Sequence, residues 1–182
     1  EFIARTEITS STASVIFSNY TDNSKYDNYM LQLSETKPVS GGTELLVQVG
    51  TSSSYRTSGY QGHITKLAHD SSSYAAYQGD NKSGCVVVVA ADTAPDVGIP
   101  WFTFAGHKYD SDYDDNIYNP GNSNIQTSFT INSFYKNQSN VWNSSVGGWG
   151  SESDQNHTHL KILYSSGNID KGIFSLYGIK KS

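Results

Sequence analysis

Cysteine, methionine and helix-forming residues are scarce in this sequence, and each scarcity narrows what the chain can be. Cys85 is the only cysteine among 182 residues, so no disulfide forms within the chain and stability has to come from packing or assembly. Because Cys85 opens the apolar run Cys85–Ala91, we expect a small buried hydrophobe there rather than a nucleophile. The scarcity of helix formers disfavours a helical fold.

Long apolar runs and clustered positive charges are missing as well. The longest apolar run, Cys85–Ala91, is far shorter than the roughly 18 residues of a membrane-spanning helix. Lysine and arginine are scattered along the chain and the formal net charge is −5, so no basic stripe is available to hold a phosphate backbone. We therefore expect no membrane span and no nucleic-acid partner.

Aromatic and small polar residues are abundant instead. Aromatic residues make up 13% of the chain and charged residues only 16%, a balance typical of extracellular β-proteins. Within Tyr26–Gly50, apolar and polar residues alternate on both sides of a Pro/Gly break at residues 37–42. A period of two with one apolar side indicates half-buried strands, so this stretch predicts an antiparallel hairpin.

Other short segments with strand patterns follow along the chain, separated by turn residues. We expect further strands at Ile3–Ile8, Ala13–Phe17, residues 59–70, Tyr74–Gln78, Cys85–Ala91, Trp101–Asp110 and Ile125–Tyr135, and a second hairpin from His157–Tyr164 and Gly172–Ile179. Roughly ten short strands without a helical stripe predict an all-β fold, an antiparallel β-sandwich of jelly-roll-like topology. We expect residues 1–182 to form one such domain.

Several of these segments carry a resemblance to a known family. The strand ASVIFSN at residues 13–19, the Tyr26–Gly50 stretch with its PVSGG loop, and the ending YSSGNIDKGIFSLYGI resemble a β-domain of tailed-bacteriophage virion proteins. The chain is similar in particular to the C-terminal parts of tail fibres. This resemblance implies an extracellular virion protein, the C-terminal piece of a longer fibre chain, commonly a homotrimer, that touches the host surface. It supplies no motif of catalytic residues.

Two segments, residues 109–124 and 136–156, are predicted to be long loops at one end of the sandwich, and long loops are often functional. Isolated aromatic residues stand in them among Gly, Ser, Asn and Asp, namely Trp142, Trp149, Tyr113 and Tyr118. Flat aromatic rings can stack on a sugar while short polar groups bond its hydroxyls. These four residues are the candidate carbohydrate-binding residues. The alternative is that they fold back as lids over the end of the sandwich.

Two groups of side chains are candidates for binding a metal. Asp110, Asp112 and Asp114 alternate as at the start of a calcium loop, but Asp115 and Gly121 stand where an EF-hand needs glycine and glutamate. An EF-hand is therefore excluded, and the segment is either a looser calcium site or a solvated acidic loop. No other cofactor is expected.

His157 and His159 stand two residues apart in a predicted strand, and two such side chains point to the same side. They could reach one metal ion, and the threefold axis of a trimer would multiply the ligands to six imidazoles. The simpler interpretation is two histidines at a solvated strand end.

A hydrolase has weaker support. Ser151 lies in GWGSES, which does not match the nucleophile elbow, and Glu152 with Asp154 is the one nearby carboxylate pair. The hypothesis favoured by the sequence is a non-catalytic receptor-binding domain of a tail fibre that attaches to a bacterial surface polysaccharide. A structural trimerisation or capping domain and a polysaccharide depolymerase or esterase remain the alternatives.

Overall fold

The computed structural model describes residues 1–22, 24–52, 54–70, 74–91, 101–108, 125–137, 139, 141–151 and 157–180. Within these ranges the chain forms twelve β-strands. In chain order they are β1 (Phe2–Ile8), β2 (Val15–Ser18), β3 (Tyr26–Pro38), β4 (Thr43–Gly50), β5 (Tyr60–Ala68), β6 (Tyr74–Lys82), β7 (Cys85–Ala91), β8 (Trp101–Lys108), β9 (Ile125–Lys136), β10 (Trp142–Ser151), β11 (His159–Tyr164) and β12 (Ile169–Lys180). The described part of the chain holds no helix long and apolar enough to cross a membrane.

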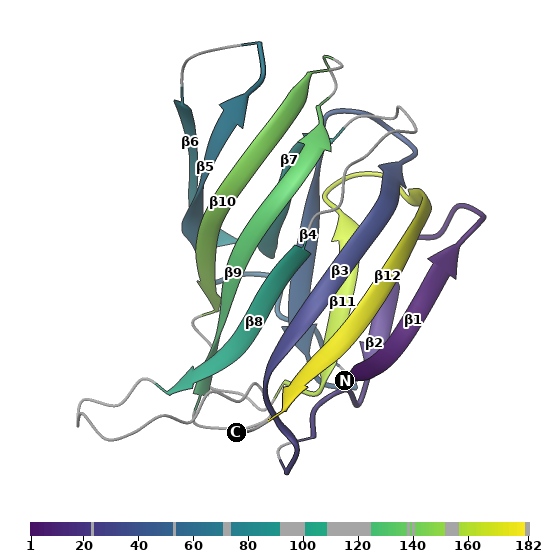
Figure 1. Cartoon of the computed structure of the whole chain (residues 1–182), viewed down its shortest axis with the longest axis vertical. Helices are drawn as coiled ribbons and strands as arrows, with labels where there is room; N and C mark the ends of the chain where they lie inside the picture. Colours follow the sequence, from purple (N-terminus) through teal and green to yellow (C-terminus); the bar gives the residue numbers. More distant parts are fainter. Residues whose placement is uncertain are drawn as a thin grey trace.

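The strands form two antiparallel sheets, and in Figure 1 the smaller sheet lies behind the larger one. The larger sheet has eight strands in the order β1-β12-β3-β8-β9-β10-β5-β6, and the smaller has four in the order β2-β11-β4-β7. The predictions of an all-β fold and of a two-layer antiparallel sandwich are confirmed.

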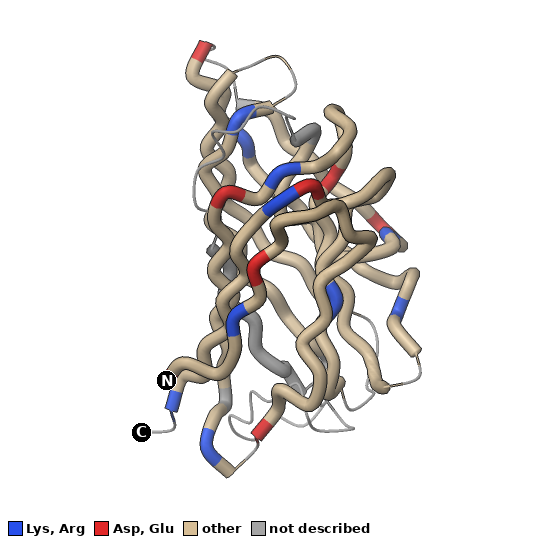
Figure 2. The backbone as a smooth tube through the Cα atoms, turned by 90° about the vertical axis from the view of Figure 1, so that its right-hand side faces the viewer, with Lys and Arg blue, Asp and Glu red and all other residues tan. Residues whose placement is uncertain are grey.

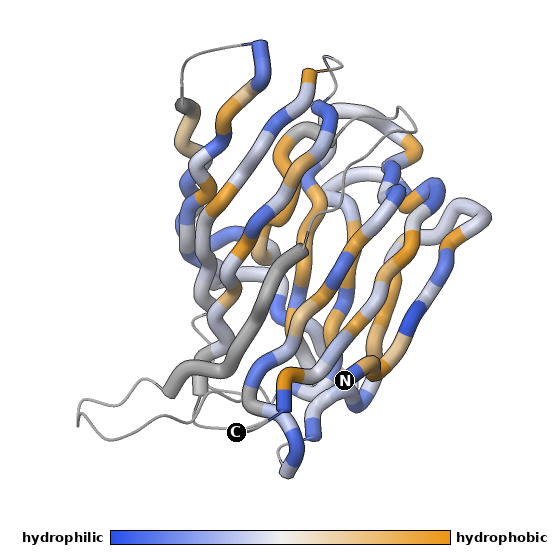
Figure 3. The backbone as a smooth tube through the Cα atoms, in the orientation of Figure 1, coloured by the Kyte–Doolittle hydropathy of each residue, from blue (hydrophilic) through white to orange (hydrophobic). Residues whose placement is uncertain are grey.

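A hydrophobic core fills the space between the two sheets. Leu31 and Leu33 of β3 and Val47 and Val49 of β4 are all 0% exposed, and they belong to one buried cluster. Hydrophobic residues recur along the strands of both sheets (Figure 3). Full burial of one such side chain contributes about 1.5–3 kcal/mol, so this core is the main source of stability.

Strand β7 confirms that Cys85, at the start of an apolar run, is a small buried hydrophobe. Cys85, Val86 and Val87 are each 0% exposed, so both faces of the strand are covered. Burial also raises the pKa of the Cys85 thiol, which keeps it protonated. Cys85 therefore acts as a packing residue and is not activated as a nucleophile.

Both predicted hairpins are wrong, because the two halves of each lie in different sheets. Strand β3 pairs with β12 and β8 in the larger sheet, whereas β4 pairs with β11 and β7 in the smaller one. Residues 39–42 therefore carry the chain across the core from one sheet to the other. The same is true of β11 and β12, which follow one another in sequence but belong to different sheets.

The predicted long loop at residues 136–156 is also wrong, because most of its described length is strand β10. This strand lies between β9 and β5 and pairs with both in unbroken antiparallel register. Its glycines and serines have little intrinsic preference for a strand, but two neighbouring strands satisfy its backbone hydrogen bonds. The other predicted loop, residues 109–124, lies outside the described residues.

Charged residues of both signs are interspersed along the described backbone (Figure 2). The ion pairs that they form are largely exposed, such as Arg5 with Glu7 at 3.1 Å and Lys37 with Asp170 at 3.0 Å. Exposed pairs contribute at most about 1 kcal/mol each. Electrostatics therefore adds little to the stability that the core provides.

Two glycines of β10 should differ in how strongly the same substitution destabilises the protein. A Cβ on Gly147 would lie 2.1 Å from the His63 carbonyl oxygen and 2.7 Å from Ile64 Cα, whereas one on Gly150 would meet nothing within 4 Å. We expect Gly147→Ala to lower the free energy of unfolding by about 2–3 kcal/mol, and Gly150→Ala to change it by less than about 0.5 kcal/mol. Chemical denaturation measures both, and equal effects would contradict the position of β10 beside β5.

Candidate functional site

Strand β10 holds two of the three tryptophans and places them on opposite faces of the larger sheet. Successive side chains of a strand alternate between faces, and the seven-residue step from Trp142 to Trp149 is odd. Trp149 is 3% exposed and belongs to the core, whereas Trp142 is half-buried at the start of the strand. Trp142 and Trp149, the two candidate sugar-binding residues on this strand, therefore have different surroundings.

The prediction that Trp149 projects from a loop is wrong. Its indole lies over two glycines of neighbouring strands, since a Cβ would stand 2.8 Å from its Cδ2 on Gly62 and 3.0 Å from its Cη2 on Gly79. Tyr77 packs beside it with ring centroids 6.5 Å apart, and the Tyr77 hydroxyl is hydrogen-bonded to Glu44 and Lys82. Trp149 therefore fills the inner side of the sheet and offers no ring face to a ligand.

Trp142 lies on the outer side of the sheet and forms an aromatic stack. Its ring and that of Phe134 are parallel within 4°, with centroids 4.7 Å apart, and the Lys136 ammonium nitrogen lies 5.3 Å from the Trp142 ring centroid. Phe134 remains 49% exposed in this arrangement. Stacking and the cation–π contact fix the two rings as a rigid platform.

The platform stands at one end of a surface that we call the β9–β10–β5 face, formed by the outward side chains of these three strands. The register places Ser144 of β10 between Phe134 and Leu67, and Val146 between Asn132 and Thr65. Residues directly opposite one another in antiparallel strands share a face. Val146 is 57% exposed and Leu67 37% exposed, so this face is open to solvent.

Beyond Val146, the outward positions of β10 are Gly148 and Gly150. Gly148 lies between Thr130 and His63, and Gly150 lies between Ser128 and Gln61. The space above Gly150 is open, because a Cβ there would meet no other atom within 4 Å. The β9–β10–β5 face thus joins an aromatic platform to a low strip bordered by hydroxyl, amide and imidazole groups.

Phe134 and the polar border were not identified from the sequence. Phe134 lies in a strand that was expected, Ile125–Tyr135, and there the outward residues Thr130, Asn132 and Phe134 alternate with buried ones. That alternation was the available signal, since an aromatic on the polar side of a strand is exposed. It could not show that Trp142 would lie beside it.

Several candidates lie outside the described residues. They are Tyr113 and Tyr118, the acidic residues Asp110, Asp112 and Asp114, and the carboxylates Glu152 and Asp154. Ser151, which was considered with the last two, ends β10 and is 0% exposed. The candidate site is therefore built from Trp142 and the residues around it.

His157 and His159 are both buried, and each contacts a different threonine. His157 Nδ1 lies 2.8 Å from Thr127 Oγ1, and His159 Nδ1 lies 2.9 Å from Thr158 Oγ1. Neither residue is at a solvated strand end, since they are 1% and 6% exposed. The described residues contain no group of three His, Cys, Asp or Glu side chains that could hold a metal ion.

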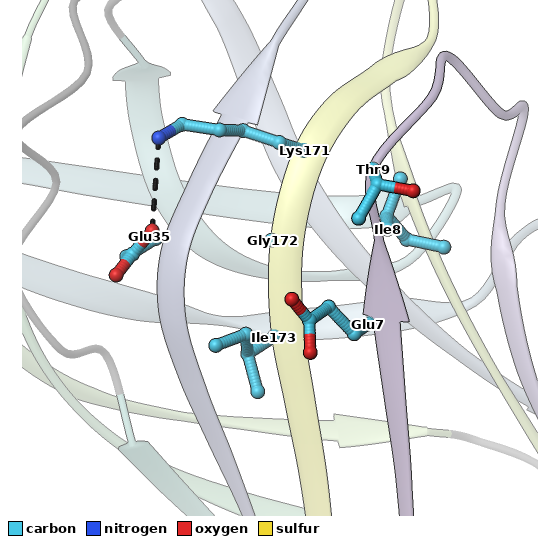
Figure 4. Close-up of a pocket in the computed structure, with 7 residues that line it drawn as sticks. All are labelled: Glu7, Ile8, Thr9, Glu35, Lys171, Gly172 and Ile173. Carbon is cyan, nitrogen blue, oxygen red and sulfur yellow. Dashed lines mark ion pairs between the residues drawn. The ribbon is translucent and has the colours of Figure 1, made fainter.

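A hollow of about 280 Å³ lies elsewhere on the larger sheet, over β12 and between β1 and β3 (Figure 4). Gly172 lies at its base, and the charged groups on its walls are already paired. Glu7 contacts Arg5 at 3.1 Å, and Glu35 contacts Lys171 at 3.6 Å. These pairs leave the hollow without a fixed, unpaired group, so it is a weaker candidate than the β9–β10–β5 face.

The buried imidazole of His157 should make stability depend on pH. Desolvation, together with the nearby positive charge of Arg56, lowers the pKa of His157 from 6.5 to about 4. The unfolded chain therefore binds a proton more readily than the folded chain below pH 6.5. We expect about 2–3 kcal/mol of stability to be present above pH 6.5 and lost as the pH falls towards 4.

His157→Gln should remove that part of the pH dependence, whereas His63→Gln at an exposed position should leave it in place. Urea unfolding at a series of pH values between about 4 and 7 measures the slope. An unchanged slope in the His157→Gln variant would show that the imidazole is not buried in its neutral form.

Comparison of the chain with protein-family models, with curated proteins and with solved structures finds no match in any of the three. The case for a function therefore depends on the geometry of the β9–β10–β5 face and on the chemistry of its side chains.

Proposed function

We propose that this protein is a non-catalytic attachment domain that binds a carbohydrate on the β9–β10–β5 face. The observation that carries the proposal is the stacked pair of Phe134 and Trp142, held rigid on a solvent-exposed sheet and followed by a strip of polar side chains. Exposed aromatic residues in such an arrangement mark an interaction surface rather than a packing surface. The proposed site therefore lies on the face of a sheet and not on the loops that the sequence predicts.

The chemistry of a sugar matches the two parts of this face. A pyranose ring has an apolar C–H side that packs against a flat aromatic ring, and hydroxyl groups at its rim that need donors and acceptors. Ser144 of β10 and Asn132 and Thr130 of the neighbouring β9 lie beside the platform. A chain of sugars lying along β10 would stack at the Trp142 end and hydrogen-bond along the strip.

The β9–β10–β5 face, platform and strip together, also has the length of an oligosaccharide rather than of one sugar. From Trp142 to Gly150 the strand advances by eight residues, or about 27 Å at the usual rise of a β-strand. Small glycine residues at the far end keep the surface low over Gly148 and Gly150. A linear polysaccharide segment is the ligand shape that this surface fits best.

We further propose that the domain adopts a jelly roll and belongs to a tail fibre of a tailed bacteriophage. Setting aside β5, β6, β9 and β10, the remaining eight strands have the orders β1-β12-β3-β8 and β2-β11-β4-β7. This alternation between two sheets supports two interlocked Greek keys. The resemblance at residues 13–19, 26–50 and 164–179 supports the fibre, with a bacterial surface polysaccharide as receptor.

Attachment of this kind gains strength from repetition. One stacked platform gives weak binding, but several copies in a trimeric fibre and on one virion act together, because later contacts form at high effective concentration. We therefore propose a homotrimer as the working form. The β9–β10–β5 face needs no residue from a neighbouring copy to present its platform.

A structural role in trimerisation or capping is the second candidate, and a separate surface favours it. Near the opposite edge of the larger sheet, on β1 and β12, Phe2 and Ile179 are 57% and 45% exposed. Phe2 packs edge-on against Tyr177 at 5.8 Å, and Tyr177 lies opposite Met30 in the register. Such an apolar surface could contact another copy of the chain, and it is compatible with sugar binding elsewhere.

The glycan-binding proposal predicts that the platform residues are needed for binding and not for folding. We expect Trp142→Ala and Phe134→Ala each to weaken binding to the cognate polysaccharide about tenfold, which corresponds to about 1.4 kcal/mol. An array of bacterial surface polysaccharides probed with the purified protein identifies the ligand, and titration of each variant measures the loss.

Ile16→Ala is the matched control, because Ile16 is 46% exposed but lies on β2 in the other sheet. It should bind as the unchanged protein does. If both platform variants retain full binding while folded, the sugar does not lie on this face. Two results together would favour the structural role. The protein would bind no polysaccharide, and sedimentation would show a trimer that dissociates more readily in the Phe2→Ala and Ile179→Ala variants.

A further inference from the structure

We propose that the polysaccharide bound by this face is acidic and carries uronic-acid carboxylates at intervals along its chain. This inference rests on the proposed function and concerns which class of glycan the face selects. It comes from the distribution of charge over the larger sheet, which differs from that of the whole chain.

Four adjacent strands of that sheet contain no aspartate and no glutamate. They are β8, β9, β10 and β5, neighbours in the order β8-β9-β10-β5. The same four strands contain three lysines and two histidines: Lys66, Lys108, Lys136, His63 and His107. Of these, Lys136 and His63 lie on the outer side of the sheet, whereas Lys66 lies opposite the buried Ser145 on the inner side. The chain as a whole has 17 acidic and 12 basic residues, with a net charge of −5.

A block of sheet without carboxylates is therefore unusual for this sequence, and it coincides with the exposed aromatic platform. An anionic chain approaching the rest of the molecule meets a net negative charge, whereas over this block it meets only neutral and basic groups. Such complementarity acts mainly on specificity, because a wrong partner suffers repulsion. Among the described residues, the four strands that form this block carry no repelling carboxylate.

Two of the basic residues lie where they can contact a bound chain. Lys136 is opposite Trp142 in the register, and its ammonium group stays within 5.3 Å of that ring centroid. Lys136 pairs with no carboxylate among the described residues, so its charge is available to a ligand. His63 is exposed and lies opposite Gly148, on the strip.

The spacing of these two residues favours carboxylates over phosphates. Trp142 and Gly148, which mark their positions along β10, are six residues apart, or about 20 Å. The Lys136 ammonium group at one end of this distance and the His63 imidazole, a hydrogen-bonding group, at the other fit a polysaccharide with one uronic acid in each repeating unit of several sugars. A polymer with a phosphate on every unit would leave most of its charges without a partner.

Acidic residues occur on the described elements that flank this block, and on the β8 side these are Asp27 and Glu35 of β3. Asp70 lies in the turn after β5, and Asp80 lies on β6, at the edge of the sheet; both are exposed. Binding of an acidic chain should therefore follow β10 rather than extend across β5 towards β6. This gives the ligand a direction along the strand.

The test compares each uronic-acid polysaccharide of a bacterial array with the same polymer after carboxyl reduction, which converts the acid to a neutral sugar. A teichoic acid provides the phosphate-bearing arm. We expect the acid form to bind at least about tenfold more tightly than its reduced form. Its affinity should fall about threefold as NaCl rises from about 0.05 M to about 0.5 M, because salt screens exposed charges.

Lys136→Gln should lower affinity for the acidic polymer several-fold more than affinity for the reduced polymer, whereas Trp142→Ala should weaken both by similar factors. Lys161→Gln, on β11 of the other sheet, is the control and should change neither. Equal binding of acidic and reduced polymers, or preference for the teichoic acid, would overturn this inference and leave carbohydrate binding intact. Failure to bind any polysaccharide would overturn both proposals.

Discussion

The surface of this protein depends on the insertion of β10 between β9 and β5. Hydrogen bonds on both edges hold a segment rich in glycine and serine in an extended conformation, which its own residues would not select. Once the strand is fixed, alternation decides the environment of each side chain. Trp149 turns inward over Gly62 and Gly79, and Trp142 turns outward onto Phe134.

The two sheets have different roles in stability and in exposure to solvent. The smaller sheet and the inner side of the larger one supply the core, where Leu31, Val47 and Val87 are removed from solvent. The outer side of the larger sheet is free of this task, so it can expose Phe134 and Val146 at little cost to stability. Rigidity of the platform comes from the same core, because a site on packed strands is held more firmly than one on a loop.

The sequence predicts which residues are extended and which side of a strand is buried, and both follow from alternation. The sequence predicts less about which strands pair with one another, because β3 and β4 show the same pattern whether they pair in one sheet or face each other across the core. Composition misleads at residues 142–151, where glycine and serine indicate a loop and tertiary hydrogen bonding overrides them. For this reason the sequence places Trp149 at the surface, and it does not bring Trp142 beside Phe134.

A glycan bound along β10 should contact Trp142 and not Trp149. The nitrogen–proton NMR spectrum of the tryptophan indole groups, recorded during titration with the polysaccharide that the protein binds, distinguishes the two residues. The Trp142 indole signal should shift on binding, while the Trp149 signal stays in place and its proton exchanges slowly with solvent. A shift of Trp149 with no change at Trp142 would contradict this prediction.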